Sequence, residues 1–298
     1  MEPNDMIDPE QISETDLILN ADGSAYHLNL LPHEIADTVI TVGDQDRVAE
    51  ISKHFDLIEL QKGKREFVTH TGYLGNKRIT VISTGIGTDN IDIVINELDA
   101  LVNIDLSTRK VNKELRSLDI IRIGTSGAVQ ADIPLDSVLV SAAAFGLDPL
   151  MHYCEHELTP DEDELLQAFK DRLPDTYLLH PYIASASAEL LNGLAADLQQ
   201  GITVTAPGFY TPQGRQVRTR TSTPELMSII QNFSLHGQRI TNLEMETAGI
   251  YGLGGNLGHK TISFNVILAN RATHQFSQQP QRSMENAIRL LLERLEKI

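Results

Sequence analysis

The sequence predicts an α/β protein in which helices cover both faces of a mixed central sheet, as a three-layer sandwich. From Asp37 onward, short β-branched runs alternate with segments of helical periodicity. With 298 residues, 41% of them hydrophobic, the chain can bury one large core. No repeat or linker divides it, so we expect a single domain over 26–298. Residues 1–25 carry seven acidic groups and no basic one, which predicts a mobile acidic arm.

The first half of the domain is predicted to begin with a strand–helix pair, over 37–43 and 47–54. A hairpin follows, with strands over 67–74 and 78–84 around Gly75-Asn76. Apolar residues at helical spacing then predict a helix over 90–102: Ile91, Val94, Ile95 and Leu98. The polar and charged residues 103–118 are interpreted as an inserted loop.

The second half contains three runs typical of buried strands, over 120–124, 137–142 and 261–269. Thr159-Pro-Asp-Glu162 is a capping box that opens a helix to about Arg172, and Thr223-Pro-Glu opens another. The segment 283–298 has one apolar face and is expected to pack on the sheet as a helix.

Charge and composition exclude several classes of function. The chain has 24 Lys+Arg against 41 Asp+Glu, a net charge of −17, which argues against nucleic acid as a partner. No stretch approaches the roughly 18 apolar residues of a membrane span, and the acidic N-terminus is unlike a signal peptide. A single cysteine, Cys154, excludes an intrachain disulfide. We therefore expect a cytoplasmic protein.

Four predicted strands end in polar turns, three of which contain glycine (42–47, 83–90 and 122–128), while the fourth, 268–271, does not. In open α/β sheets, ligands bind beyond the carboxyl ends of the strands, where glycines let backbone N–H groups face an anion. Arg47 and Arg122 add guanidinium groups suited to phosphate. Each turn taken singly is more often structural. None fits the dinucleotide or Walker pattern, which indicates a small phosphate and no nucleotide cofactor.

The segment NLEMET (242–247) is predicted to end an apolar strand. In an extended chain, Glu244 and Glu246 lie on one side and Met245 on the other. Carboxylates accept hydrogen bonds from hydroxyl groups, and methionine offers a soft apolar surface to a sugar. The alternative is an ordinary acidic helix start.

These segments together resemble the nucleoside phosphorylase family (NP-I type), the family that includes uridine phosphorylase. GDQDR (43–47) is similar to the family's GDPDR loop, with Gln45 in place of proline, and KREF (64–67) is similar to its HREF. STGIG and RIGTSGA are nearly unchanged, and NLEMET resembles the EME ribose motif. The resemblance runs from about His27 to the C-terminus, in order and with matching spacing.

The resemblance implies a site for phosphate and ribose. The residues implied for phosphate are Gly43, Arg47, Arg122, Thr125 and, from a neighbouring subunit, Arg65. Those implied for ribose are Met245, Glu246 and the neighbour's His27, which the resemblance places at the 5′ end of the sugar. A shared site implies a homo-oligomer, at least a dimer.

The base is indicated by FYTPQGR (209–215), which resembles a Phe-Tyr-x-x-Gln-x-Arg stretch of uridine phosphorylases. Gln213 offers a donor and an acceptor and Arg215 only donors, which suits the imide edge of uracil. Phe209 is expected to pack on the ring, and Arg271 to approach a carbonyl through water. Purine-acting members have a serine-aspartate pair near the strand after EME, whereas NVILANR (265–271) has no acid, which favours a pyrimidine.

The expected reaction is reversible phosphorolysis of a pyrimidine nucleoside, uridine, with inorganic phosphate as co-substrate and nucleophile. Arg47, Arg122, Arg215 and Glu246 are the expected catalytic residues. A purine nucleoside phosphorylase, a nucleosidase and a non-catalytic nucleoside-binding protein of the same fold remain alternatives.

No cofactor and no metal are expected. Glu66 and Ile86 match a monovalent-cation site of some uridine phosphorylases, but Asn90 replaces its serine, which argues against the cation. His152, Cys154 and His156 form an H-x-C-x-H segment without an evident fourth zinc ligand.

Overall fold

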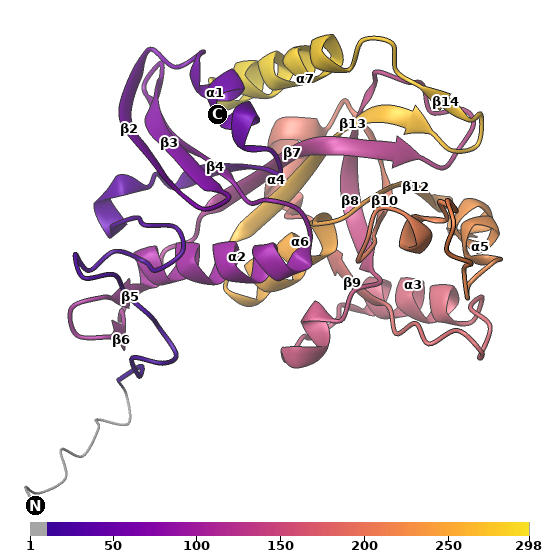
Figure 1. The fold of residues 1–298 in the computed structure, drawn as a ribbon, viewed down its shortest axis with the longest axis horizontal. Helices are drawn as coiled ribbons and strands as arrows, with labels where there is room; N and C mark the ends of the chain where they lie inside the picture. Colours follow the sequence, from indigo (N-terminus) through magenta and orange to yellow (C-terminus); the bar gives the residue numbers. More distant parts are fainter. Residues whose placement is uncertain (1–10, 298) are drawn as a thin grey trace, which may run out of the picture.

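The computed structural model describes residues 11–297, and it has the three layers that the sequence predicts (Figure 1). The middle layer is a mixed sheet whose strands follow one another in a single path. In spatial order the strands are β11 (Ser234–Leu235), β12 (Gln238–Glu244), β10 (Gln199–Thr205), β8 (Val138–Gly146), β13 (Lys260–Asn270), β7 (Asp119–Ala128), β1 (Thr38–Val42), β4 (Lys77–Ser83), β3 (Phe67–Leu74) and β2 (Leu57–Lys64). Two short strands extend it, β9 (Tyr182–Ser185) beside β8 and β14 (Gln275–Phe276) beside β13.

Part of this sheet closes on itself. Besides β10, strand β12 pairs with β7, antiparallel, through Asn242 opposite Ala128 and Leu243 opposite Gly127. The strands β7, β12, β10, β8 and β13 therefore form a closed ring. Strands β13 and β1 flank β7 and run parallel to it, and β4 runs parallel to β1. The carboxyl ends of these four strands therefore lie at the same edge of the sheet.

Helices cover the two faces of the sheet. Alternate residues of β1 face opposite cores: Val39 packs with α2 (Thr88–Asn103) and α6 (Thr247–Asn256), and Ile40 packs in a second cluster. The second cluster contains the apolar faces of α1 (Gln45–Ser52), α4 (Ala188–Ala195) and α7 (Pro280–Leu295). This period-two alternation is what a strand buried on both faces requires.

A third cluster fills the far end of the closed ring. There α3 (Pro160–Lys170) and α5 (Leu226–Asn232) pack on β8, β10 and β12. Three rings pack at its centre: Phe145 stacks on Phe169 with 4.5 Å between centroids, and Phe233 meets Phe145 edge-on at 5.5 Å. Short 3₁₀ helices complete the described part: η1 (Pro32–Glu34), η2 (Leu150–Tyr153) and η3 (Thr211–Gln213).

Most sequence-predicted elements are confirmed, within a few residues of the expected bounds. The Thr159 capping box forms as predicted, with Thr159 and Glu162 bonded reciprocally. Sequence reasoning did not identify β2, β10 or α4 as elements. The helix expected after Thr223 begins at Leu226 as α5.

The N-terminal region departs from the prediction of a mobile arm. Residues 11–25 pack against the domain, and residues 1–10 lie outside the described part. Ile12 donates its N–H to the carbonyl of Arg109, and Arg109 Nη1 donates to the Leu17 carbonyl at 2.5 Å. Arg109 belongs to a hairpin, β5 (Ile104–Asp105) and β6 (Lys110–Val111), where the sequence indicated only a loop. The acidic arm is therefore ordered from Gln11 by contacts with this inserted hairpin.

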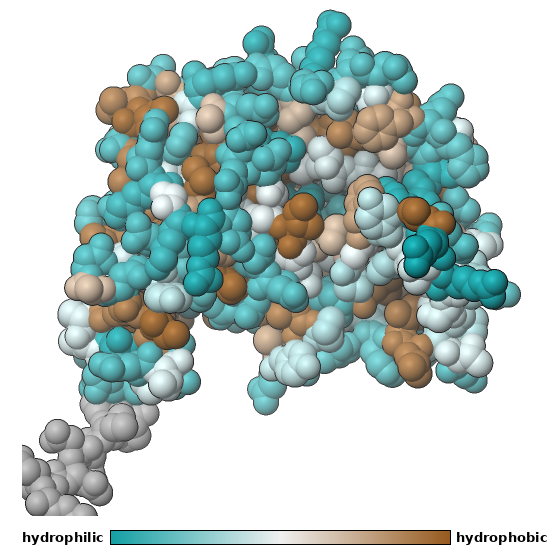
Figure 2. All heavy atoms as spheres, viewed as in Figure 1, coloured by the Kyte–Doolittle hydropathy of each residue, from teal (hydrophilic) through white to brown (hydrophobic). Residues whose placement is uncertain are grey.

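The face shown in Figure 2 is mostly hydrophilic, with separate apolar areas rather than one continuous band. Among residues 11–297, every helix is too short or too polar to cross a membrane.

Replacing Arg109 tests the docking of the N-terminal segment. In Arg109→Ala the side-chain bonds to the carbonyls of Leu17 and Ser13 are lost. We expect amide hydrogen exchange over residues 12–17 to become about tenfold faster or more, because the loss of the shorter of these two charge-assisted bonds alone has an effect of that size. Arg116→Ala, which removes an exposed pair with Asp37, is the control and leaves this exchange unchanged. Equal exchange in Arg109→Ala and the unmodified protein contradicts the docking.

Candidate active site

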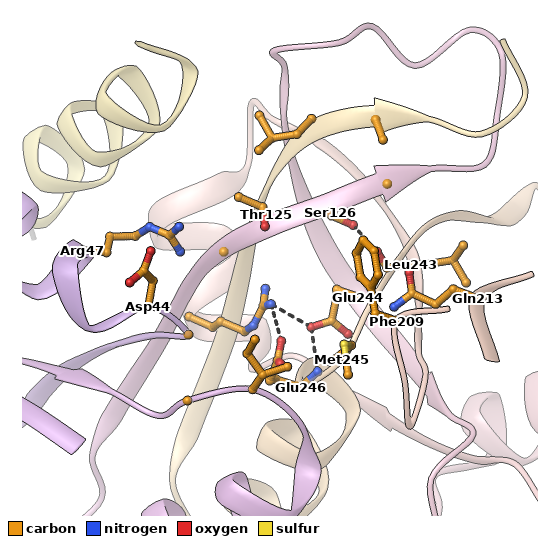
Figure 3. A pocket seen from close by; sticks show the side chains of 18 of the residues that line it. Asp44, Arg47, Thr125, Ser126, Phe209, Gln213, Leu243, Glu244, Met245 and Glu246 are labelled. Carbon is orange, nitrogen blue, oxygen red and sulfur yellow. Dashed lines mark hydrogen bonds and ion pairs between the residues drawn. The ribbon is translucent and has the colours of Figure 1, made fainter. Parts of the chain in front are cut away.

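A pocket of about 870 Å³ opens at the carboxyl ends of β1, β4, β7, β12 and β13. Figure 3 shows its layout: Arg47 and Asp44 lie at one end, Phe209 and Gln213 at the other, and Glu246 and Met245 between them. The pocket thus joins loops that are far apart in the sequence. The predicted site residues that line it are Gly43, Arg47, Arg122, Thr125, Phe209, Gln213, Arg215, Met245 and Glu246.

A buried ion cluster forms the floor between the two ends. Arg122 Nη2 lies 2.6 Å from Glu246 Oε2 and 3.1 Å from Glu244 Oε2. Its Nη1 donates to Asn265 Oδ1 at 3.2 Å. Burial opposes the positive charge, but the two carboxylates outweigh it and raise the pKa of Arg122. Arg122 is therefore a fixed cation at the centre of the site.

Gly124 makes room for this cation. A Cβ at Gly124 would lie 2.6 Å from Cζ, Nη1 and Nη2 of Arg122, closer than any side chain tolerates. The guanidinium therefore lies directly against the backbone of its own strand, two residues on. Gly124 lies within β7 and not in the turn that the sequence indicated, so its role in RIGTSGA is one of packing.

The two carboxylates of NLEMET have different neighbours. Glu244 ends β12 and accepts bonds from the Thr205 hydroxyl (2.6 Å), Glu246 N (3.0 Å) and Thr247 N (2.9 Å). It thereby caps the start of α6. Glu246 Oε1 accepts the Gly87 N–H at 2.8 Å, so this carboxylate ties the STGIG loop to Arg122. Both acids contact Arg122. The predicted alternation does not place them, because β12 ends at Glu244, Glu246 precedes α6, and Met245 lines the same pocket as the two acids.

Arg47 is the cationic residue at one end of the pocket. Asp44 caps α1 by accepting the Asp46 N–H, and Arg47 follows in the first turn of this helix. Arg47 Nε is buried and has no hydrogen-bond partner within residues 11–297. Burial lowers the pKa of Arg47. A buried cationic donor without a partner, beside a helix N-terminus, is suited to an anion such as phosphate.

The other end of the pocket is a polar loop closed by an aromatic ring. Arg215 lies over the Phe209 ring, 3.8 Å from its centroid, and Nη1 donates to Gln213 Oε1 at 2.6 Å. Burial, followed by the nearby Arg271 cation, lowers the pKa of Arg215 to about 10. Arg271 donates to the Gln213 carbonyl at 2.9 Å, so it supports the loop from behind. Gln213 itself is buried, which fixes the direction of its amide.

Three predicted site residues are not among those that line this pocket: His27, Arg65 and Arg271, of which Arg271 contacts the backbone of the Gln213 loop. Arg65 is exposed and has a left-handed backbone (φ 57°) in the turn between β2 and β3. Gln45 holds that turn by donating to the Arg65 carbonyl at 3.0 Å. Lys64 donates to Asn20 Oδ1 at 2.9 Å and to the Tyr26 carbonyl next to His27. His27 and Arg65 therefore belong to one connected surface. It borders the pocket of their own chain through Gln45 and Glu66, but neither His27 nor Arg65 lines that pocket.

Several lining residues were not singled out from the sequence: Asp44, Ser126, Gly127, Leu243, Leu268, Ala269 and Phe276. Asp44 and Ser126 lie inside the glycine-containing motifs at 42–47 and 122–128, so these motifs could have indicated them. Phe276 lies on β14 and reaches the pocket only through the pairing of β14 with β13, for which the sequence has no local signal.

The side chains considered for ions have other partners. His152 Nε2 bonds to the His180 carbonyl, and His156 bonds to Asn256 Oδ1 and the Ile183 carbonyl. Asn90 packs against Gly85 near Glu66. In the described range, no group of three His, Cys, Asp or Glu side chains is placed to hold a metal ion.

Comparison with known proteins identifies the class. The family model described as phosphorylase superfamily matches residues 37–296. A uridine phosphorylase of Thermococcus kodakarensis is 29% identical, covering 86% of this chain and 81% of that protein. A DeoD-type purine nucleoside phosphorylase of Buchnera aphidicola is 24% identical, covering 91% and 98%. A Trypanosoma brucei nucleoside phosphorylase structure, described as showing uridine phosphorylase activity, aligns with a TM-score of 0.87 and 28% identity, over 95% of this chain and 100% of that one.

The chain belongs to the phosphorylase superfamily. Within it, the protein is a pentosyltransferase of the nucleoside phosphorylase type, similar to uridine phosphorylases.

Replacing Gly124 tests whether the reaction depends on the position of the Arg122 guanidinium. A methyl group in Gly124→Ala displaces the guanidinium from both carboxylates, and we expect phosphorolysis (kcat/KM for phosphate) to fall by about 10²-fold or more. Gly193→Ala, in α4, where an added Cβ meets nothing within 4 Å, is the control and retains activity. A Gly124→Ala enzyme with unchanged kcat/KM means that the position of Arg122 does not matter for the reaction.

Proposed function

We propose that this protein catalyses the reversible phosphorolysis of uridine to uracil and ribose 1-phosphate in the cytoplasm, without a cofactor. The observation that carries the proposal is the order of groups along one pocket. An arginine with an unpartnered buried donor lies at one end, and a glutamine–arginine pair in contact with an aromatic ring lies at the other. Between them Glu246 is held by Arg122 and Gly87.

Each group has a role in this reaction. Gly43, Arg47 and Thr125 hold phosphate with Arg122, so that a phosphate oxygen faces C1′ of the ribose. Glu246 and Met245 hold the sugar as C1′ becomes cationic. As the glycosidic bond breaks, its electron pair moves to the base, and the cation of Arg215 stabilises the charge on the uracil carbonyls. Phosphate is the nucleophile, so no side chain forms a covalent bond.

The base end supports a pyrimidine with an imide edge. Gln213 Oε1 already accepts from Arg215 and has a second lone pair for N3–H, while its amide N–H groups can donate to a carbonyl. Arg271 supports this loop and is proposed to reach a base carbonyl only through water. Relatives named uridine phosphorylase and relatives named purine nucleoside phosphorylase both match the chain, so the base is the point to test.

We further propose a dimer with shared sites. His27 and Arg65 lie outside the pocket of their own chain yet share one connected surface, as expected if both enter the site of a second copy. A two-fold interface repeats the same surface twice, so one contact completes two sites.

Release of free base from a panel of nucleosides, with and without phosphate, tests the proposed reaction. We expect cleavage of uridine that requires phosphate, and slower cleavage of cytidine by roughly 10⁴-fold, because cytidine has no N3–H and presents an amino group at C4. Uridine cleavage at an equal rate without phosphate indicates a hydrolase. Inosine cleavage without uridine cleavage indicates a purine nucleoside phosphorylase.

Subunit complementation tests the shared site. Arg65→Ala loses a charge-assisted bond to phosphate, about 1.5–3 kcal/mol, or one to two orders of magnitude in phosphate affinity. We expect mixing with Arg122→Ala, under conditions of confirmed subunit exchange, to restore up to about a quarter of the sites, because both lesions in a mixed dimer fall in the same pocket. Exchange without recovery, or a fully active monomer by sedimentation, contradicts the shared site.

A further inference from the structure

Glu97 is a buried acid whose position the reaction does not explain. It lies on α2, three residues after Val94 and one before Leu98, on the face that packs into the core. Its side chain is only 11% exposed. A carboxylate at such a position needs strong hydrogen-bond donors to offset its loss of hydration.

All of the donors come from the segment that carries His27. Glu97 Oε2 accepts the N–H groups of His27 (3.0 Å) and Leu28 (2.8 Å). Oε1 lies 2.6 Å from His27 Nδ1. The carboxylate thus fixes both the backbone and the ring of His27, although the two residues are 70 positions apart.

This contact determines which ring nitrogen of His27 is free to bond to another group, and whether that nitrogen donates or accepts. Glu97 has no proton to donate as a carboxylate, so Nδ1 must carry the hydrogen of their bond. In the neutral ring, Nε2 is then a lone-pair acceptor. Nε2 makes no hydrogen bond within residues 11–297, and the ring is held between Tyr26 (4.9 Å between centroids) and Phe67 (6.4 Å).

We propose that Glu97 is a positioning residue that sets the tautomer of His27, so that the site of the neighbouring subunit selects nucleosides with a hydrogen-bond donor at the 5′ position. The proposal rests on the proposed function and on the shared site. A 5′-hydroxyl donates to Nε2, and so does a 5′-ammonium group. A 5′-fluorine, similar in size, has no hydrogen to donate.

The substitution Glu97→Gln exchanges donor and acceptor in the bond between residue 97 and His27 Nδ1. The glutamine carbonyl oxygen is required by the Leu28 and His27 N–H groups, which leaves the amide NH₂ facing Nδ1. Nδ1 then accepts, and the hydrogen moves to Nε2. The histidine becomes a donor toward the sugar while the shape of the site is preserved.

The experiment compares kcat/KM for 5′-amino-5′-deoxyuridine and 5′-fluoro-5′-deoxyuridine, with uridine as reference. For each enzyme form, kcat/KM for the amino compound is divided by kcat/KM for the fluoro compound. This amino-to-fluoro ratio is then divided by the same ratio measured in His27→Ala, a variant that lacks the imidazole ring. We expect the unmodified enzyme to favour the amino compound by about tenfold or more, and Glu97→Gln to shift the ratio by at least the same factor toward the fluoro compound. In the double variant Glu97→Gln/His27→Ala the shift disappears, since it acts through His27.

Glu34→Gln is the matched control. Glu34 is a carboxylate with the same 11% side-chain exposure, bonded to the Leu31 N–H and Lys62, without contact to His27. We expect it to leave the amino-to-fluoro ratio unchanged. The phosphate KM and the melting temperature of each variant show that the fold is retained.

The outcomes separate this inference from the proposed function. Absence of phosphate-dependent uridine cleavage in the unmodified enzyme refutes the proposed function itself. An active enzyme in which Glu97→Gln leaves the ratio unchanged, or shifts it equally with and without His27, overturns the tautomer assignment. An unmodified enzyme that prefers the fluoro compound also overturns it, because Nε2 is then a donor.

Discussion

The contact of one buried guanidinium with two buried carboxylates is the constraint on which the site depends. Arg122, Glu244 and Glu246 are each at most 6% exposed, so each charge is stable only while its partners remain in place. Their other bonds reach Thr205 on β10, Asn265 on β13 and Gly87 before α2. The groups proposed to bind phosphate and those proposed to bind the sugar therefore belong to one network of charges.

The sequence predicted the layers and most of the site because these depend on local patterns. Apolar periodicity indicated α2, and the turn motifs indicated Arg122 and Glu246. The role of Glu244 was not predicted: its donor Thr205 lies 39 residues away, on a strand whose pattern was too short to recognise. The order of residues 11–25 likewise depends on Arg109, across more than 90 positions. Glu97 was visible as an acid on an apolar helix face, but its partner was not.

Two departures from the family pattern have structural partners in this chain. Gln45, where the family has proline, bonds to the Arg65 carbonyl, and Lys64, where it has histidine, bonds to the Tyr26 carbonyl. Both act on the surface that carries His27 and Arg65. A proline at position 45 suits the first turn of a helix but has no side-chain donor. Glutamine at this position can therefore bond to the turn at Arg65, whereas proline cannot.

The closed ring of strands has a consequence for how the chain reaches its native state. Bonds that complete the pocket floor join residues 116 to 124 positions apart, such as Asn242 with Ser126 and Glu246 with Arg122. Loop-closure entropy opposes such pairings until most of the chain is in place, and high contact order slows folding. The pocket is therefore completed among the last steps of folding. A ligand that binds only the completed pocket stabilises the finished fold and raises the population of completely folded enzyme.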